Sequence, residues 1–149
     1  MQKAGTQAKT YFQSGYKCAE SALMAIAENQ GIKNDLIPAL ATGFCSGMAR
    51  TGGICGAVAG SVMGLSLVYG RKNSSDAVEP LYTIEKIFLQ EFTDRFGSTS
   101  CEGLIHCDFN TPEGQSRYNE NKLYNDCFQY VEEAVDLAVK LIEEHPAIN

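Results

Sequence analysis

Apolar residues recur three and four positions apart along most of the chain, and strict alternation of apolar and polar residues is almost absent. The first spacing places apolar side chains on one face of an α-helix, whereas alternation is typical of a half-buried β-strand. We therefore predict an all-α fold. Its expected form is a single-domain bundle of about five to six helices, spanning residues 1–149, around a central apolar helix rich in glycine.

Glycine, proline and polar residues set the expected limits of the helices. In chain order the predicted segments are Ala4–Gln13, a helix from about Cys18 that Gly31 stops, a helix after Asn34, roughly Cys55–Tyr69, a helix with Pro80 in its first position that ends at Phe96 and Gly97, and roughly Tyr124–Glu144. The stretches 45–53 and 97–122 are expected to be loops, because turn-forming residues dominate them.

Four of these segments have a clear apolar stripe, which we expect to face the core. The stripes consist of Cys18, Ala22, Ala25 and Ile26; of Leu36, Ile37, Leu40, Ala41 and Phe44; of Leu81, Ile84, Phe88 and Phe92; and of Cys127, Val131, Ala134, Val135, Ala138, Leu141 and Ile142.

The segment from Gly52 to Gly70 carries no charge, so it must be weighed as a membrane span. Its helical part would be only about 22 Å long, against about 30 Å of bilayer hydrocarbon. We therefore predict a buried central helix and no membrane insertion. The spacing of Gly56, Gly60 and Gly64 then indicates a close approach between helices.

The net charge and the first fifteen residues exclude some classes of partner and indicate the cellular compartment. The formal net charge is −6, with Lys and Arg scattered along the chain, so nothing favours nucleic acid or an anionic membrane surface as a partner. The first fifteen residues lack the apolar core of a secretory signal, and we expect a cytoplasmic protein in a reducing compartment. Six cysteines in such a compartment do not by default form a disulfide framework.

Four of the cysteines share a position relative to the predicted helices. Cys18, Cys55 and Cys101 each begin a helix or helical turn, and Cys127 lies in the first turn of the last helix. Unpaired backbone N–H groups and the helix dipole favour negative charge there, which lowers a thiol pKa and suits a metal–thiolate cluster. If these helix ends converge, they form a thiolate pocket. Each cysteine taken alone is equally compatible with a buried small apolar residue.

Other sequence patterns add little. CxxC and CxxCH are both absent, so a thioredoxin-like dithiol, covalent haem and paired zinc knuckles are not indicated. His106 lies between Cys101 and Cys107 and is either a ligand or a solvated loop residue, whereas His145 is expected to complement the end of the last helix. The remaining clustered acids are expected to form a solvated helix face, namely Glu132, Glu133, Glu143 and Glu144.

The stretch Cys55-Gly56-Ala57-Val58-Ala59-Gly60 resembles the CGAxxG motif of the C_GCAxxG_C_C family of small redox-active proteins. The family pattern has one cysteine upstream of the motif and two downstream. Cys18, Cys55, Cys101 and Cys127 follow that order, and the similarity covers nearly the whole chain. Cys45 and Cys107 are additional to the pattern, and each is an alternative ligand, a resolving thiol or a buried filler.

The resemblance implies redox activity, since related segments occur joined to haem and iron–sulfur electron-transfer modules. In the first hypothesis, Cys18, Cys55, Cys101 and Cys127 hold an iron–sulfur cluster, [2Fe–2S] in its expected form, and Cys45 and Cys107 are possible further ligands. Gly56, Ala57 and Gly60 would let the cluster and the neighbouring helices approach the backbone.

Two other hypotheses remain open. In one, no metal binds, and Cys55 is a low-pKa nucleophile that forms a disulfide with Cys18 or Cys101, as in a thiol–disulfide oxidoreductase or a redox sensor. In the other, the site is a structural zinc centre in an interaction domain. A redox protein of unknown identity is the expected partner, and a homodimer is conceivable for an apolar bundle with abundant small residues.

Overall fold

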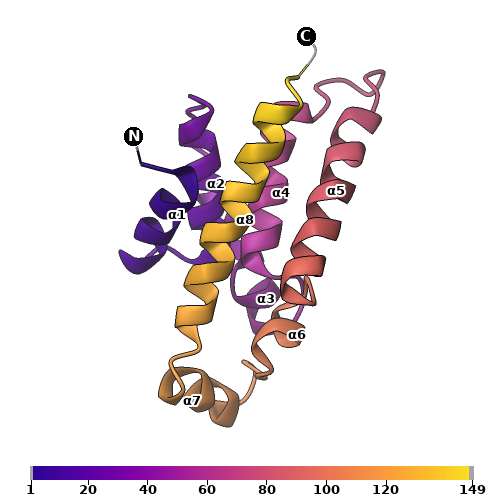
Figure 1. The fold of residues 1–149 in the computed structure, drawn as a ribbon. Coiled ribbons are helices and arrows are strands. Elements are labelled where there is room, and N and C mark those ends of the chain that lie inside the picture. The colour runs from indigo at the N-terminus through magenta and orange to yellow at the C-terminus, as the bar shows by residue number, and fades with distance from the viewer. Residues whose placement is uncertain (1, 148–149) are drawn as a thin grey trace.

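The computed structural model describes residues 2–147, which form one bundle of helices (Figure 1). Its elements are α1 (Ala4–Gln13), α2 (Cys18–Asn29), the 3-10 helix η1 (Ala39–Phe44), α3 (Cys45–Arg50), α4 (Gly56–Tyr69), α5 (Glu79–Phe96), α6 (Cys101–Ile105), α7 (Pro112–Glu120) and α8 (Tyr124–Glu144). Within residues 2–147 there is no β-strand, only an isolated bridge between Ile54 and Ser100. The all-α prediction is confirmed.

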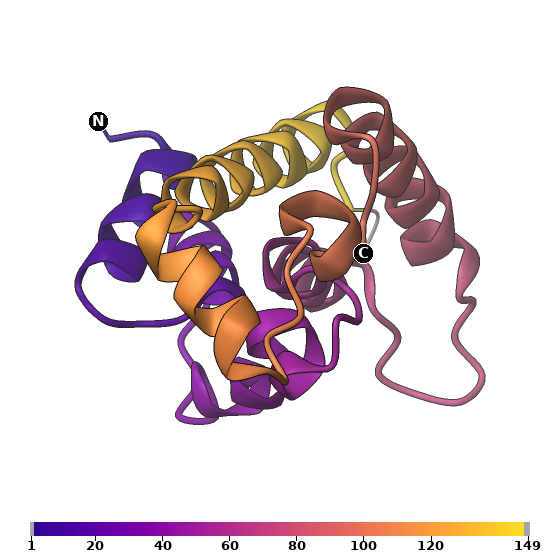
Figure 2. The same ribbon diagram turned by 90° about the horizontal axis from the view of Figure 1, so that it is seen from below.

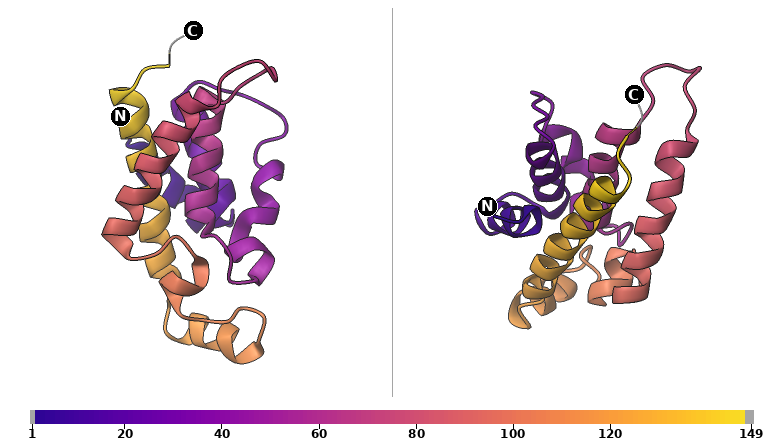
Figure 3. Two further views of the ribbon diagram at one scale, coloured as in Figure 1. Left: turned by 90° about the vertical axis from the view of Figure 1, so that its right-hand side faces the viewer. Right: turned by 45° about the horizontal axis from the view of Figure 1, so that its top comes forward.

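Helix α4 is the centre of the bundle, with α2, α5 and α8 packed around it (Figures 1 and 3). Most of its side chains are buried, including Val58 and Leu65, which have no exposed surface. Such all-round burial explains why the helix is apolar on every side rather than along one stripe. No helix in residues 2–147 combines the length and apolarity needed to cross a bilayer.

Glycine spacing brings α4 and α2 into close contact. A Cβ added at Gly60 would lie 2.9 Å from both Ala19 Cα and Ala22 Cβ, and one at Gly64 would lie 2.6 Å from the side chain of Ile26. Real side chains do not tolerate such distances, so the two backbones can lie this close only because these positions carry no side chain. The predicted close helix approach is confirmed.

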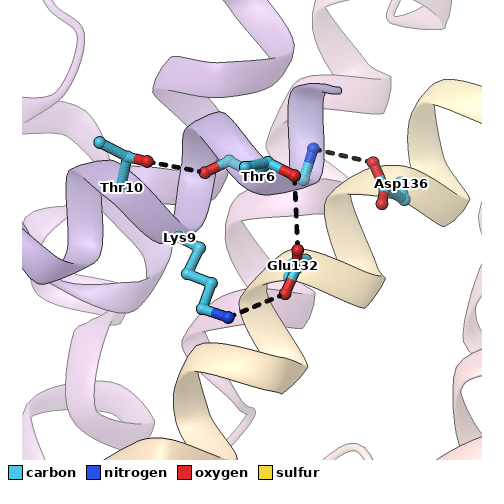
Figure 4. A network of polar contacts seen from close by, with 6 residues as sticks. Thr6, Lys9, Thr10, Glu132 and Asp136 are labelled. Carbon is cyan, nitrogen blue, oxygen red and sulfur yellow. Dashed lines mark hydrogen bonds and ion pairs between the residues drawn. The ribbon is translucent and has the colours of Figure 1, made fainter. Parts of the chain in front are cut away.

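Helix α1 is fixed to α8 by polar contacts at its amino end (Figure 4). The backbone N–H of Gly5 donates to Asp136 Oδ1 at 2.8 Å, and Glu132 accepts from both Thr6 Oγ1 and Lys9 Nζ at 3.4 Å. Because α1 has no capping side chain of its own, Asp136 satisfies one of its unpaired N–H groups from the neighbouring helix. Glu132 is therefore paired rather than free on a solvated face.

The predicted helix after Asn34 is wrong in its extent and in its buried face. The chain forms only the short 3-10 helix η1, and Leu36 and Leu40 are 65% and 50% exposed. Pro38 explains the difference, since its ring excludes the helical hydrogen bond at that position and disfavours α geometry in the preceding residue.

The segment 97–122, expected to be a loop, contains the two short helices α6 and α7. Both begin at capped positions, because the Ser100 side chain accepts from Gly103 N–H and the Thr111 side chain accepts from Gly114 N–H. Pro112 in the first turn of α7 is a further start signal. These two helices and α3 raise the number of α-helices in residues 2–147 to eight, above the expected five to six.

The short helices lie together at one end of the bundle. In Figure 1, α3, α6 and α7 occupy the lower end, where α4 and α8 begin, and Figure 2 shows this end from below. The helix beginnings therefore meet where three short helices cover the ends of the long ones.

The glycine contact leads to a test of the α2–α4 packing. Replacing Gly60 with Val should lower the free energy of unfolding by about 2–3 kcal/mol, because the new side chain would overlap Ala19 and Ala22. Gly43→Val is the matched control, since nothing lies within 4 Å of that position, and it should change stability by no more than about 0.5 kcal/mol. Urea unfolding followed by helical circular dichroism measures both. Equal effects of the two substitutions would contradict the packing argument.

Candidate functional site

A cavity of about 310 Å³ lies at the end of the bundle where the helices begin. Its walls come from the amino ends of α2, α4, α6 and α8, with α3 and α7 completing the enclosure. Four cysteines line it, one from each of those four helix beginnings: Cys18, Cys55, Cys101 and Cys127. Residues far apart in the sequence thus place their thiols in one space.

Local structure explains where each thiol lies. Cys18 and Cys101 are the first residues of α2 and α6, Cys55 immediately precedes α4, and Cys127 is in the first turn of α8. Cys55 and Cys101 are buried, whereas Cys18 and Cys127 are partly exposed.

Two backbone hydrogen bonds fix Cys55 relative to Cys101. Cys55 N–H donates to the carbonyl of Thr99, and Cys101 N–H donates to the carbonyl of Gly53, both at 2.7 Å. These bonds flank the antiparallel bridge between Ile54 and Ser100, so the two cysteines lie diagonally across it on the same face.

Two glycines, which have no side chain, leave room for two of the cysteine sulfurs. A Cβ at Gly56 would collide with the Cys18 sulfur, and a Cβ at Gly47 would lie 3.1 Å from the Cys101 sulfur. Gly56 and Ala57 line the cavity, as expected for residues that let a bound group approach the backbone. Gly60 does not line it, and its role is to pack against α2.

Burial raises the pKa of three cavity thiols, those of Cys55, Cys101 and Cys127, which corrects the expectation that Cys55 is a low-pKa nucleophile. Burial raises the pKa of Cys55 to about 12, although the N–H groups of Ala57 and Val58 at the start of α4 act to lower it. Burial likewise raises the pKa of Cys101 to about 12 and raises that of Cys127. Desolvation therefore outweighs the effect of the helix beginnings.

The cavity thiols also influence one another electrostatically. Cys127 and Cys101 contribute to the raised pKa of Cys55, and Cys127 contributes to that of Cys101. Ionising one thiol therefore makes ionisation of the next more costly. Cys55, Cys101 and Cys127 would therefore act as a unit in any chemistry that requires thiolates.

Cationic and phenolic groups that the sequence analysis did not select also line the cavity. Lys17 precedes α2, Arg50 ends α3, and both side chains are exposed at the cavity wall. Tyr118 of α7 forms a hydrogen bond with the Cys127 thiol that lowers its pKa, in opposition to burial. The sequence held a weak signal for α7 in its Thr111-Pro112 start, but none that placed Tyr118 beside Cys127.

Part of the cavity wall is a left-handed helical turn. Ser46, Gly47, Met48 and Ala49 have φ between 57° and 65° and ψ between 39° and 69°, and Arg50 has a φ of 69°. Left-handed geometry costs a non-glycine residue about 1–2 kcal/mol, so tertiary contacts must hold this turn. Among them are the hydrogen bonds that the carbonyl of Gly47 accepts from Gly53 N–H and the Thr51 hydroxyl. The stretch expected to be a loop is thus an ordered cavity wall.

The remaining candidate residues lie outside the cavity lining. The Cys45 thiol contacts the carbonyl of Ala41 at 3.6 Å, and Cys107 is buried in the main core. His106 ends α6 in left-handed geometry and is exposed. At the end of α8, the carbonyl of His145 accepts a hydrogen bond from the Tyr69 hydroxyl at 2.6 Å.

The side chains that line the cavity do not form a site for a single metal ion. Among residues 2–147, no group of three or more His, Cys, Asp or Glu side chains is placed to surround one ion. A tetrahedral zinc site needs four ligands at about 2.0–2.3 Å from the metal, which this arrangement does not offer. The cavity gathers four thiols without focusing them on one point.

Residues 16–141 match the sequence model of a family described as "Putative redox-active protein (C_GCAxxG_C_C)". The chain belongs to this family. The resemblance seen in the CGAxxG stretch is thereby confirmed, and the matched range contains all four cysteines of the cavity. Comparisons with curated proteins and with solved structures found no match.

The structure gives a role to the glycines of the CGAxxG motif that is typical of the C_GCAxxG_C_C family. The glycines of the CGAxxG stretch serve two purposes in this structure, because Gly56 leaves space for the Cys18 sulfur and Gly60 sets the contact between α4 and α2. The motif therefore positions Cys55 and Cys18 together.

The raised thiol pKa values predict a specific pH dependence of stability in the metal-free protein. The unfolded Cys55 thiol ionises near pH 8.5, whereas the folded one stays protonated up to about pH 12. Between these values the unfolded state binds fewer protons, so stability falls as the pH rises, by at most about 1.4 kcal/mol per pH unit for one such thiol. Below pH 8 this effect is absent.

Cys55→Ala removes that thiol and should make the decline shallower by about 1 kcal/mol per pH unit between pH 9 and 11. Urea unfolding of the wild type and the variant at several pH values measures the two slopes. Parallel slopes would show that Cys55 ionises as easily in the folded state as in the unfolded state.

Proposed function

We propose that this protein is an electron carrier or redox module that holds an iron–sulfur cluster of the [2Fe–2S] type in the cavity. Cys18, Cys55, Cys101 and Cys127 are the proposed ligands, two for each iron. The observation that carries the proposal is that four cysteines from four separate helix beginnings line one cavity in a protein of a redox-active family. A bound cluster of this type accepts and releases single electrons.

The arrangement of the thiols favours a two-iron cluster over a single zinc ion. A two-iron cluster distributes its four cysteine ligands over two metal centres, so no three sulfurs need to surround one point. This agrees with four thiols around a cavity in which no group of three is placed for one ion.

The electrostatics favour metal binding over a free nucleophile. A thiol whose pKa is about 12, as for Cys55, is almost entirely protonated at neutral pH and attacks a disulfide slowly. A metal ion, in contrast, deprotonates a coordinating thiol outright. Uptake of the cluster would therefore release protons from the Cys55, Cys101 and Cys127 thiols, whose pKa values burial raises.

The surroundings of the cavity suit a negatively charged thiolate cluster. An oxidised [2Fe–2S] core carries two positive charges, so four thiolates would leave a net charge of about −2. Lys17 and Arg50 at the cavity wall are placed to balance it, and the N–H groups of Ala57 and Val58 are available for hydrogen bonds to sulfur.

A disulfide of Cys55 with Cys18 or Cys101 is the alternative from the sequence, and the bridge between Ile54 and Ser100 argues against the Cys55–Cys101 pair. The two cysteines are diagonal neighbours, which lie roughly 7–8 Å apart in regular antiparallel pairs, whereas a disulfide requires Cα atoms within about 6.8 Å. Direct bonding would need movement of the backbone.

Metal analysis tests the proposal. Protein purified without oxygen should be brown and contain about two iron and two sulfide per chain. Cys55→Ala should lose the visible absorption and most of the iron, because one of four ligands is gone. Cys107→Ala is the matched control, since Cys107 is buried to a similar degree but lies outside the cavity lining, and it should keep both.

A colourless protein that takes up neither iron nor sulfide on anaerobic reconstitution would overturn the cluster proposal. Helical circular dichroism of both variants shows whether a loss of iron reflects a lost ligand or a lost fold.

Tyr118 provides a finer test through the reduction potential. Its phenol bonds to the Cys127 sulfur, and hydrogen bonds to ligand sulfurs raise the potential of iron–sulfur centres. Tyr118→Phe should therefore lower the midpoint potential while leaving the iron content unchanged. Tyr82→Phe, at a position 52% exposed and outside the cavity lining, should shift neither quantity. A redox titration followed by visible absorption compares the three proteins. An unshifted potential in Tyr118→Phe would mean that the phenol does not act on the cluster.

A further inference from the structure

Cys45 is a neighbour of Cys18 that does not line the cavity. With Ala19, Leu23 and Ala41 it forms a small buried cluster, and Cys18 packs against that cluster. Cys45 is 5% exposed, whereas Cys18 is partly exposed and lines the cavity. Cys18 therefore lines the cavity and also packs against the cluster that holds a second cysteine.

The first turn of α2 holds the Cys45 sulfur in place. This sulfur lies 3.9 Å from Glu20 Oε1 and 3.6 Å from the carbonyl of Ala41. The backbone N–H groups of Ala19 and Glu20 also face it. These contacts place the sulfur against the turn that Cys18 begins.

The packing places the two thiols next to each other. Cys18, the first residue of α2, packs against the small cluster that contains Cys45, and the Cys45 sulfur lies against the first turn of the same helix. In keeping with this contact, the Cys18 thiol acts together with burial to raise the pKa of Cys45. Cys107 belongs to the large core cluster and not to the small cluster that Cys45 forms with the first turns of α2. Of the two cysteines outside the cavity lining, Cys45 is the one positioned to react with Cys18.

We propose that Cys18 and Cys45 form a reversible disulfide, and that this bond removes Cys18 from the set of cavity thiols. The family pattern requires Cys18 but not Cys45, so the pair would make the site of this particular chain sensitive to oxidation. The role of the bond in controlling cluster binding rests on the proposed function, whereas the bond itself does not.

A low-molecular-weight disulfide such as oxidised glutathione is the proposed oxidant. The Cys18 sulfur, the more exposed of the two, attacks one sulfur of the oxidant, and one glutathione leaves as a thiol. The Cys45 thiol then loses its proton, and its sulfur attacks Cys18 in the mixed disulfide and displaces the second glutathione; the raised Cys45 pKa slows this step, and the position of both sulfurs in one folded protein favours it. The protein loses two protons and two electrons, and the oxidant gains both to become two thiols.

Cluster binding and disulfide formation would then compete for one sulfur. A Cys18 bound to iron cannot attack the oxidant, and a Cys18 bonded to Cys45 cannot bind iron. The cavity would hold a full set of four ligands only while this pair is reduced.

Oxidation of the metal-free, folded protein with oxidised glutathione tests the inference. Thiol titration in denaturant should fall from six free cysteines to four, and the intact mass should drop by two hydrogen atoms. Peptide mapping without reduction should recover Cys18 joined to Cys45. Cys107→Ala should form the same link, and dithiothreitol should reverse it in both proteins.

Cys45→Ala separates the possible outcomes. It should form no internal disulfide and instead retain glutathione on Cys18. In the wild type, prior oxidation should abolish uptake of iron until dithiothreitol is added, whereas iron uptake by Cys45→Ala should recover only when the glutathione is removed.

Two results would overturn the inference: no internal disulfide in the folded wild type, or a map in which other cysteines are joined. A mapped Cys18–Cys45 bond in a protein that never takes up iron would support the inference and overturn the cluster proposal. The two failures are thus distinguishable.

Discussion

The close contact between α4 and α2 is the constraint on which the rest of the structure depends. Gly60 and Gly64 let the two helices touch along their length, and Gly56 extends the contact to the point where the Cys18 sulfur lies. Because both helices begin at the same end of the bundle, this contact also brings Cys18 and Cys55 to one cavity. A side chain at any of these glycines would separate the helices and the thiols together.

A second constraint is the balance between helix ends and burial. The amino end of α4 supplies N–H groups that stabilise a Cys55 thiolate. Removal of water destabilises the thiolate by more than these N–H groups stabilise it, so the thiol stays protonated. Such a cavity is poorly suited to a reactive thiolate. It is better suited to a cationic metal centre, which would replace the protons and use the same N–H groups as hydrogen-bond donors to sulfur.

The backbone geometry of the short elements around the cavity differs from that of the long helices. The long helices α5 and α8 follow ordinary packing, with Phe88 and Val135 fully buried. In contrast, the turn from Ser46 to Arg50 adopts left-handed geometry, which local preferences oppose. Its first residue follows Cys45, and it reaches the Cys101 sulfur at Gly47. Unfavourable backbone geometry is therefore concentrated where cysteines meet, as is common at functional sites.

The sequence by itself determined the all-α class, the limits of α1 and α8 and the buried stripe of α8, because helical periodicity and end signals act within a few residues. It also identified the four cysteines that begin helices. It failed at Leu36 and Leu40, where Pro38 and packing overrode the apolar spacing. It gave α6 only as a helix or helical turn beginning at Cys101, and it missed α7, because such short helices leave little periodicity. Only the tertiary structure decided that the four thiols share one cavity, that burial raises the pKa values of Cys55, Cys101 and Cys127, and that Cys18 packs against the cluster of Cys45. Those properties depend on water exclusion and on contacts between residues tens of positions apart, which no local pattern encodes.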